Sequence, residues 1–173
     1  MVETGKRVYR SPLREEQARA TRRTIVEAAR DLFLEQGYSG TTIDAVAARA
    51  GVSRKTVFTS VGGKAQLLKL AWDWALVGDD EPVPMIECPA VRRMMAATDP
   101  EDLIDLWVPF VAEIASRIAG LHGVLVAAAD VDEEAAAIQE RSEQDRLEGG
   151  RGFVGGLHAI GGLRSGLSVD EAV

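Results

Sequence analysis

Residues 41–64 hold two short helical patterns separated by a break of about three residues, and this spacing restricts the fold more than any other feature. Thr41 or Thr42 can cap the first helix, because a threonine hydroxyl accepts a hydrogen bond from the free amides of the first turn. Gly51 stands where a helix usually ends in a left-handed residue, and Ser53 can cap the second helix. The spacing therefore predicts a helix-turn-helix.

The apolar residues of this stretch are spaced to hold the two helices against each other. Ala47 is small and precedes the turn by one helical turn, so the helices can cross closely over it. With the apolar positions turned inward, the second helix leaves a row of hydrogen-bond donors outside, which suits phosphates and base edges in a major groove. The alternative is a plain helical hairpin with a solvated polar face. The inward set is Val57, Phe58 and Val61, and the outward set is Arg54, Lys55, Thr56, Thr59 and Ser60.

The segment TTIDAVAARAGVSRKTVF, followed by GGKAQLL, resembles the DNA-binding half of the TetR-type (tetracycline-repressor-like) bacterial transcription regulators. The resemblance implies that the second helix is the recognition helix and that Thr42 and Lys64 contact phosphates. The chain departs from the family pattern at Phe58, Ser60 and Val61, where an aromatic hydroxyl residue, a histidine or similar residue, and a phenylalanine are usual. Because Phe58 has no hydroxyl, we expect it to pack or to contact a sugar.

Arginines near the start of the preceding helical pattern extend this candidate surface. Arg22 and Arg23 lie early in that pattern and can reach the DNA backbone, although an arginine-rich helix face is also compatible with simple solvation. Each phosphate contact steepens the salt dependence of binding by about 0.9 in a log-log plot. The complete set of predicted DNA-binding residues is Thr42, Ser53, Arg54, Lys55, Thr56, Phe58, Thr59, Ser60, Lys64, Arg22 and Arg23.

The charge is divided unevenly along the 173 residues. Residues 1–64 hold 12 Lys or Arg against 7 Asp or Glu, whereas residues 65–173 hold 8 against 20, for a net charge of -7. A basic end joined to an acidic remainder is typical of a DNA-facing module attached to a domain that does not face DNA.

The composition also bears on the compartment. A single cysteine, Cys88, excludes an intramolecular disulfide and a thiolate metal cluster. The sequence shows no uninterrupted apolar run near the roughly 20 residues that span a bilayer, and its start lacks the apolar segment of a secretion signal. We predict a cytoplasmic protein.

The helical patterns predict an all-α chain with an arm and two modules. Residues 1–11 are predicted to be a basic disordered arm, 12–63 a helix-turn-helix DNA-binding domain, and 64–173 a helical ligand-binding and dimerisation domain. This second domain opens with a linker helix over 64–77 and a proline-rich loop over 78–89 that we expect to lie outside any helix.

Further helices are predicted within the second domain. They cover residues 91–97, a long stretch from Asp99 with a kink at Pro109, and 133–147 capped by Asp132. The glycine-rich stretch that follows keeps helical spacing, but we expect a helix there only if it is closely packed.

The long helix carries large apolar residues that a kink can open into a pocket. The predicted effector-pocket residues are Trp107, Phe110, Met94 and Met95, and ordinary core packing is the alternative. His122 and His158 have no second ligand at helical metal-site spacing, and no catalytic constellation is evident. We therefore predict no enzyme activity, no metal site and no cofactor.

The resemblance implies a homodimeric repressor that binds a palindromic double-stranded DNA operator and is released by a small-molecule effector. The final LRSGLSVDEAV resembles the lead-in to the family's last pair of helices, which usually form the dimer interface, and we expect the chain to lack them. Two other classes remain open: a helical protein-interaction module that has lost DNA binding, and a small helical enzyme.

Overall fold

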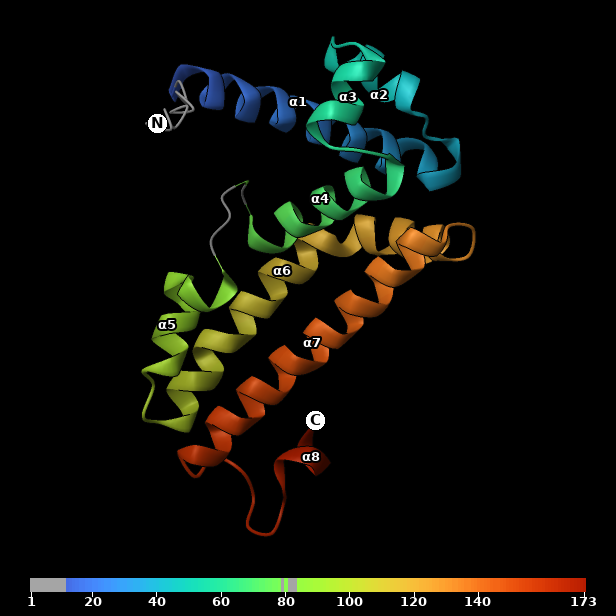
Figure 1. Cartoon of the computed structure of the whole chain (residues 1–173). Coiled ribbons are helices and arrows are strands. Elements are labelled where there is room, and N and C mark those ends of the chain that lie inside the picture. Colours follow the sequence, from blue (N-terminus) through green and yellow to red (C-terminus); the bar gives the residue numbers. More distant parts are fainter. Residues whose placement is uncertain (1–11, 79, 81–83) are drawn as a thin grey trace, which may run out of the picture.

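The computed structural model describes residues 12–78, 80 and 84–173, and its regular elements in these ranges are all helical (Figure 1). The predicted arm over 1–11, as well as residues 79 and 81–83 of the predicted loop, lie outside the described residues. The helices are α1 (Pro12–Gly40), α2 (Ile43–Ala50), α3 (Arg54–Ser60), α4 (Lys64–Val77), α5 (Pro89–Met95), α6 (Pro100–Ala129), α7 (Glu133–Ala159) and α8 (Val169–Ala172), with a 3-10 turn η1 (Met85–Glu87).

Helix α1 supplies the base on which α2, α3 and α4 pack. Its apolar residues recur at helical spacing, so they form a continuous buried stripe. The helix breaks at Gly37, whose φ of 72° lies in the left-handed region, and one further turn carries Tyr38 into the core, where its ring stacks on Phe33. The buried stripe of α1 comprises Ile25, Val26, Ala28, Ala29, Leu32 and Phe33.

One apolar core joins the N-terminal helices to the second module. Leu121, Leu125 and Ala128, from the C-terminal half of α6, are buried in the same cluster as Leu67 and Leu68 of α4. In Figure 1 this end of α6 lies against α4, below α1, while the other end extends away from the helix-turn-helix beside α5 and α7. The predicted boundary near residue 63 is therefore bridged by shared packing.

A smaller cluster lies at the far end of the α6–α7 pair. Met94 of α5, Leu103 of α6 and Leu157 of α7 are its buried members. The Trp107 ring stacks on Phe153 of α7 at 4.3 Å between centroids, and this aromatic contact ties the two long helices together.

Two expectations about the second module are wrong in detail. The segment predicted to lie outside any helix contains the 3-10 turn η1, and α5 begins at Pro89 rather than at residue 91, because proline is well suited to the first helical turn. Helix α7 does not stop near residue 147 but continues through the glycines to Ala159, and an added methyl at Gly149, Gly152 or Gly155 would meet nothing within 4 Å. Close packing therefore does not account for these glycines.

The long helix α6 differs from the prediction that no apolar segment nears the length that spans a bilayer. Among the described residues it is the one helix whose length and composition would allow it to cross a membrane, with a mean hydropathy of 1.5 over 18 residues, 11% of them buried. It continues through Pro109, and its C-terminal half contributes to the core. Exposed Ile104, Val108 and Val111 account for part of its apolar character.

Candidate nucleic-acid interface

The turn between α2 and α3 has the geometry that the sequence predicts. Thr42 is the N-cap of α2, and its Oγ1 accepts a hydrogen bond from the Ala45 amide at 3.1 Å. Gly51 ends α2 in the left-handed conformation, with φ 67° and ψ 28°. Ser53 caps α3, since its Oγ accepts from the Thr56 amide at 3.0 Å. Thr41, the other candidate cap, is buried and donates to the Gly37 carbonyl instead.

The crossing of the two helices leaves one face of α3 open to solvent. Val46 and Ala47 of α2 and Val57 of α3 are buried where the helices meet. Phe58 was expected to turn inward with Val57, but its residue surface is 46% exposed. It joins Arg54, Lys55 and Thr59 on the exposed side of the helix, whereas Thr56 and Ser60 are half-buried.

Several hydroxyl groups expected to face DNA are engaged within α3. The Ser53 and Thr56 hydroxyl oxygens are 2.8 Å apart and share a hydrogen bond. Thr59 donates to the Lys55 carbonyl at 3.0 Å. A hydroxyl retains acceptor capacity when it donates, so these groups can still accept a bond from a base amino group.

Arg54 is held between two neighbours on the exposed face. Its Nη1 donates to the Asp44 carboxylate of α2 at 2.8 Å, and its guanidinium carbon lies 5.6 Å from the centre of the Phe58 ring. Arginine over an aromatic face is an attractive cation–π arrangement. The pairing with Asp44 was not anticipated from the sequence, because it depends on how α2 and α3 cross.

Lys64, the predicted phosphate contact at the start of α4, is half-buried. Its Nζ donates to the Tyr38 carbonyl at 3.0 Å and lies 4.1 Å from the centre of the Tyr38 ring. The Tyr38 hydroxyl in turn donates to Asp132, the N-cap of α7, at 2.5 Å. This hydrogen bond holds the pKa of the Asp132 carboxyl below its usual range, while burial first, and then the bond to Asp132, raises the pKa of Tyr38. Tyr38 therefore connects Lys64, at the start of α4, to the N-terminus of α7.

The two arginines of α1 that were predicted to contact DNA, Arg22 and Arg23, point to different places. Arg22 donates from Nε to the carbonyl of Ser60, the last residue of α3, at 3.2 Å, so it lies beside the candidate interface. Arg23 bonds Glu27 at 3.0 Å and has an ion pair with Asp80 at 3.7 Å, at the far end of α4. The structure does not bring Arg23 to the recognition face of α3.

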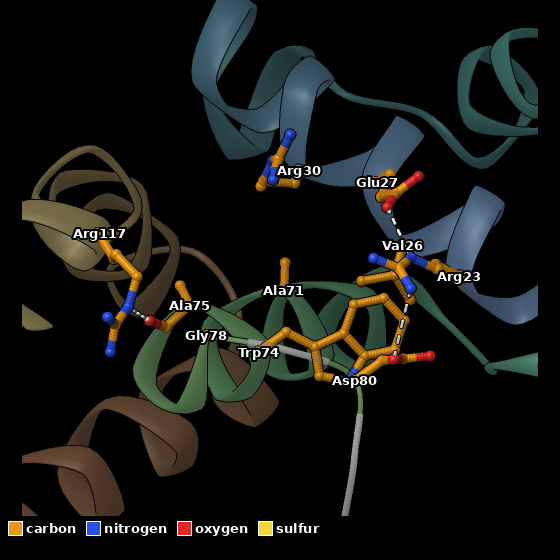
Figure 2. Close-up of a pocket in the computed structure, with 10 residues that line it drawn as sticks. All are labelled: Arg23, Val26, Glu27, Arg30, Ala71, Trp74, Ala75, Gly78, Asp80 and Arg117. Atoms are coloured by element: carbon orange, nitrogen blue, oxygen red, sulfur yellow. Dashed lines mark hydrogen bonds and ion pairs between the residues drawn. The ribbon is translucent and has the colours of Figure 1, made fainter. Parts of the chain in front are cut away.

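A cavity of about 340 Å³ lies where α1, α4 and α6 meet. Figure 2 shows Arg30 and Arg23 on the α1 side, Ala71 and Trp74 on α4, and Arg117 reaching from α6. Arg117 donates to the carbonyl oxygens of Ala75 and Leu76, each at 2.8 Å, and so binds the last turn of α4. A cation at a helix C-terminus is favourable because the free carbonyls there carry partial negative charge.

The four residues predicted to line an effector pocket do not all come together. Met94, Trp107 and Phe110 belong to the cluster at the far end of α6, whereas Met95 is 68% exposed. Neither the cavity at Arg117 nor a shallower hollow beside Arg93 and Leu106 is lined by any of the four. Their part in effector binding stays a prediction.

Comparison with known proteins gives one family match, over the helix-turn-helix region, and two curated relatives. The family model of bacterial regulatory proteins of the TetR family matches residues 25–71. Over 53 residues, or 31% of this chain, the sequence is 40% identical to the HTH-type transcriptional regulator SrpR of Pseudomonas putida. It is 38% identical, over a segment of the same length, to the uncharacterized HTH-type transcriptional regulator TtgW of the same species. These alignments span 25% and 40% of the two relatives, respectively.

Similarity in fold extends over most of the chain. A TetR-family transcriptional regulator from Mesorhizobium loti superposes with a TM-score of 0.64 at 21% identity, covering 87% of this chain and 74% of that one. A mutant of HlyIIR gives a TM-score of 0.61 at 15% identity, covering 88% and 78%. At these identities the likeness concerns the fold alone.

The arrangement of α1 to α3 defines a helix-turn-helix module attached to a helical second module. The family match over residues 25–71 assigns the helix-turn-helix module to the TetR family of bacterial regulatory proteins.

Proposed function

We propose that the chain is a sequence-specific DNA-binding transcriptional regulator, a repressor that binds a palindromic operator as a homodimer and leaves it when a small molecule binds the second module. The observation that carries the proposal is the exposed face of α3, where Arg54, Lys55, Phe58 and Thr59 stand clear of the core beside the α2 N-cap. An exposed second helix in this motif enters the major groove, with its N-terminal residues nearest the base edges.

The other proposed contacts follow from their positions around α3. Thr42 and Ser53 stand at helix N-termini, where free amides attract phosphate. Arg22 and Ser60 lie together at the end of α3, and Lys64 opens α4. Lys64 must exchange its bond to the Tyr38 carbonyl for one to phosphate if it contacts DNA.

Release by an effector requires a link between the later helices of the second module and its linker helix, α4. The bonds from Arg117 of α6 to the last carbonyls of α4 provide one such link. The bond between Tyr38 and Asp132 provides a second, because the Tyr38 carbonyl also accepts from Lys64 of α4. A shift of α4 would alter the separation of the recognition helices in a dimer, and half-sites about 34 Å apart tolerate little mismatch. Trp107 and Phe110, together with Met94 and Met95, remain the proposed effector residues.

The test is fluorescence anisotropy of the 173-residue chain on DNA from upstream of its own gene and on scrambled DNA, at several salt concentrations. The proposal predicts tighter binding to the upstream DNA, with an affinity that falls steeply with salt. Arg54→Ala should weaken specific binding by about 1–3 kcal/mol more than binding to scrambled DNA. Weak and equal binding to both DNAs would instead favour a protein-interaction module.

Repression and dimerisation need separate measurements. Sedimentation velocity on the same chain, with and without operator DNA, tests the dimer, since a symmetric dimer should bind one palindromic duplex per two chains. A reporter gene behind the operator tests the direction of regulation. Lower expression in the presence of the chain is the expected result, and higher expression would identify an activator.

A further inference from the structure

Asp44 has no role in the proposed DNA contacts, yet it pairs with the residue that opens α3. It lies in the first turn of α2, and its Oδ2 accepts from Arg54 Nη1 at 2.8 Å. The two side chains remain 68% and 59% exposed, so the pair stands on the surface. On another side of Arg54, the Phe58 ring centre lies 5.6 Å from the guanidinium carbon.

This arrangement leaves the arginine free to read a base. A guanidinium has five N–H donors in a fixed fork, and the bond to Asp44 uses one of them. Two of the remaining donors match the O6 and N7 acceptors of guanine in the major groove. Because Asp44 and Phe58 already restrict Arg54, less side-chain freedom is lost when it binds.

The carboxylate also makes a phosphate a poor partner for Arg54. Asp44 offsets the charge of Arg54 and would itself be repelled by a phosphate, whereas a guanine edge is uncharged and offers acceptors. Lys55, the next residue, is exposed and makes no ion pair with the described residues, so it suits a phosphate better. Arg54 therefore suits a guanine edge, and Lys55 suits a phosphate.

We propose that Asp44 is a positioning residue that, with Phe58, directs Arg54 to a guanine edge in the operator and away from the phosphate backbone. The inference rests on the proposed DNA-binding function and adds the base that the recognition helix reads.

The experiment begins by selecting the operator from random double-stranded DNA with the full chain. Anisotropy then gives affinities for the selected site, for sites in which each G·C pair is changed in turn to A·T, and for scrambled DNA. Among these sites, one replacement should weaken wild-type binding by about 5- to 150-fold, the value of a bidentate arginine–guanine contact. The same replacement should have little effect on Arg54→Ala.

Asp44→Ala separates positioning from a general structural role. We expect it to lose most of the discrimination at that base pair. Its affinity for scrambled DNA should rise, with a log-log salt slope steeper by about 0.9, because the freed Arg54 gains a phosphate contact. In an Arg54→Ala background, Asp44→Ala should leave the discrimination at that base pair unchanged. The matched control is Asp73→Ala, which removes a carboxylate paired with Lys69 on α4 and should preserve discrimination.

Two results would overturn the inference in distinguishable ways. If Asp44→Ala weakens binding to operator and scrambled DNA equally, or leaves the discrimination at the guanine intact, then Asp44 does not position Arg54 even though the chain binds DNA. If the wild-type chain selects no sequence at all, the proposed function fails first and the inference fails with it.

Discussion

The hydrogen bond between Tyr38 and Asp132 offers the sharpest test of how the two modules are joined. Tyr38 is 3% exposed, and its hydroxyl donates to the Asp132 carboxylate at 2.5 Å across 94 residues of sequence. Tyr38→Phe removes the hydroxyl alone. The ring remains to stack on Phe33 and to receive Lys64, and Asp132 keeps its bonds from the Glu134 and Ala135 amides at the start of α7.

The expected loss of stability follows from the chemistry of that bond. A hydrogen bond to a charged group contributes about 1.5–3 kcal/mol to the free energy of unfolding. For a chain of this size, 1 kcal/mol lowers the melting temperature by about 2–4 °C, so Tyr38→Phe should melt about 3–12 °C below the wild type. Thermal unfolding followed by circular dichroism at about pH 7 measures this difference.

The pH dependence of the difference gives an independent check. The folded-state pKa of Asp132 is lowered, so its contribution is present above the usual carboxyl pKa and is lost as the pH falls through the folded value. The folded-state pKa of Tyr38 is raised, so its contribution is complete below the usual tyrosine pKa and is lost as the pH rises through the folded value. The difference between variant and wild type should therefore be constant between about pH 4 and pH 10 and shrink outside that window.

A surface ion pair on α7, the helix that Asp132 caps, provides the control. Arg141 and Asp145 are 66% and 54% exposed, and such a pair contributes about 0.3–0.5 kcal/mol, so Arg141→Gln should lower the melting temperature by less than about 2 °C. Equal shifts for Tyr38→Phe and Arg141→Gln would refute the view that the bond to Asp132 holds the modules together.

Three further substitutions test the backbone and the core by urea denaturation. Gly51→Ala should destabilise the chain by about 1–2 kcal/mol, because φ is 67° there, and no change in the denaturation midpoint would contradict the turn geometry. Gly152→Ala should instead stabilise it by about 0.5–1 kcal/mol, since this glycine lies inside α7 with nothing within 4 Å of an added methyl; a loss of stability would indicate an unrecognised contact. Leu125→Ala should cost about 2–5 kcal/mol, as Leu125 is 1% exposed in the shared core, and a cost below about 1 kcal/mol would mean that α6 does not pack on α1 and α4 as described.

Local sequence predicted the helix-turn-helix well because its determinants are local. A threonine or serine hydroxyl caps the helix that follows it, and a glycine supplies the left-handed residue that ends one, as at Thr42, Gly51 and Ser53. The cap of α7 by Asp132 was predicted for the same reason.

The errors arose where burial by distant elements decides the outcome. Helical spacing alone does not tell which side of a short helix is covered, so Phe58 was expected inside although only the Val57 side of α3 is buried. The exposed glycines of α7 weaken the local signal for a helix without abolishing it, so the true end of α7 was missed.

The sequence by itself determined the helical class, the turn between α2 and α3 and the division into a basic and an acidic part, because spacing, capping and charge are properties of short segments. Only the tertiary structure decided that Asp44 meets Arg54, that Tyr38 meets Asp132 and that Arg117 binds the end of α4. Each of these contacts joins a side chain to a group from another helix or its cap, and the distances depend on how those helices cross.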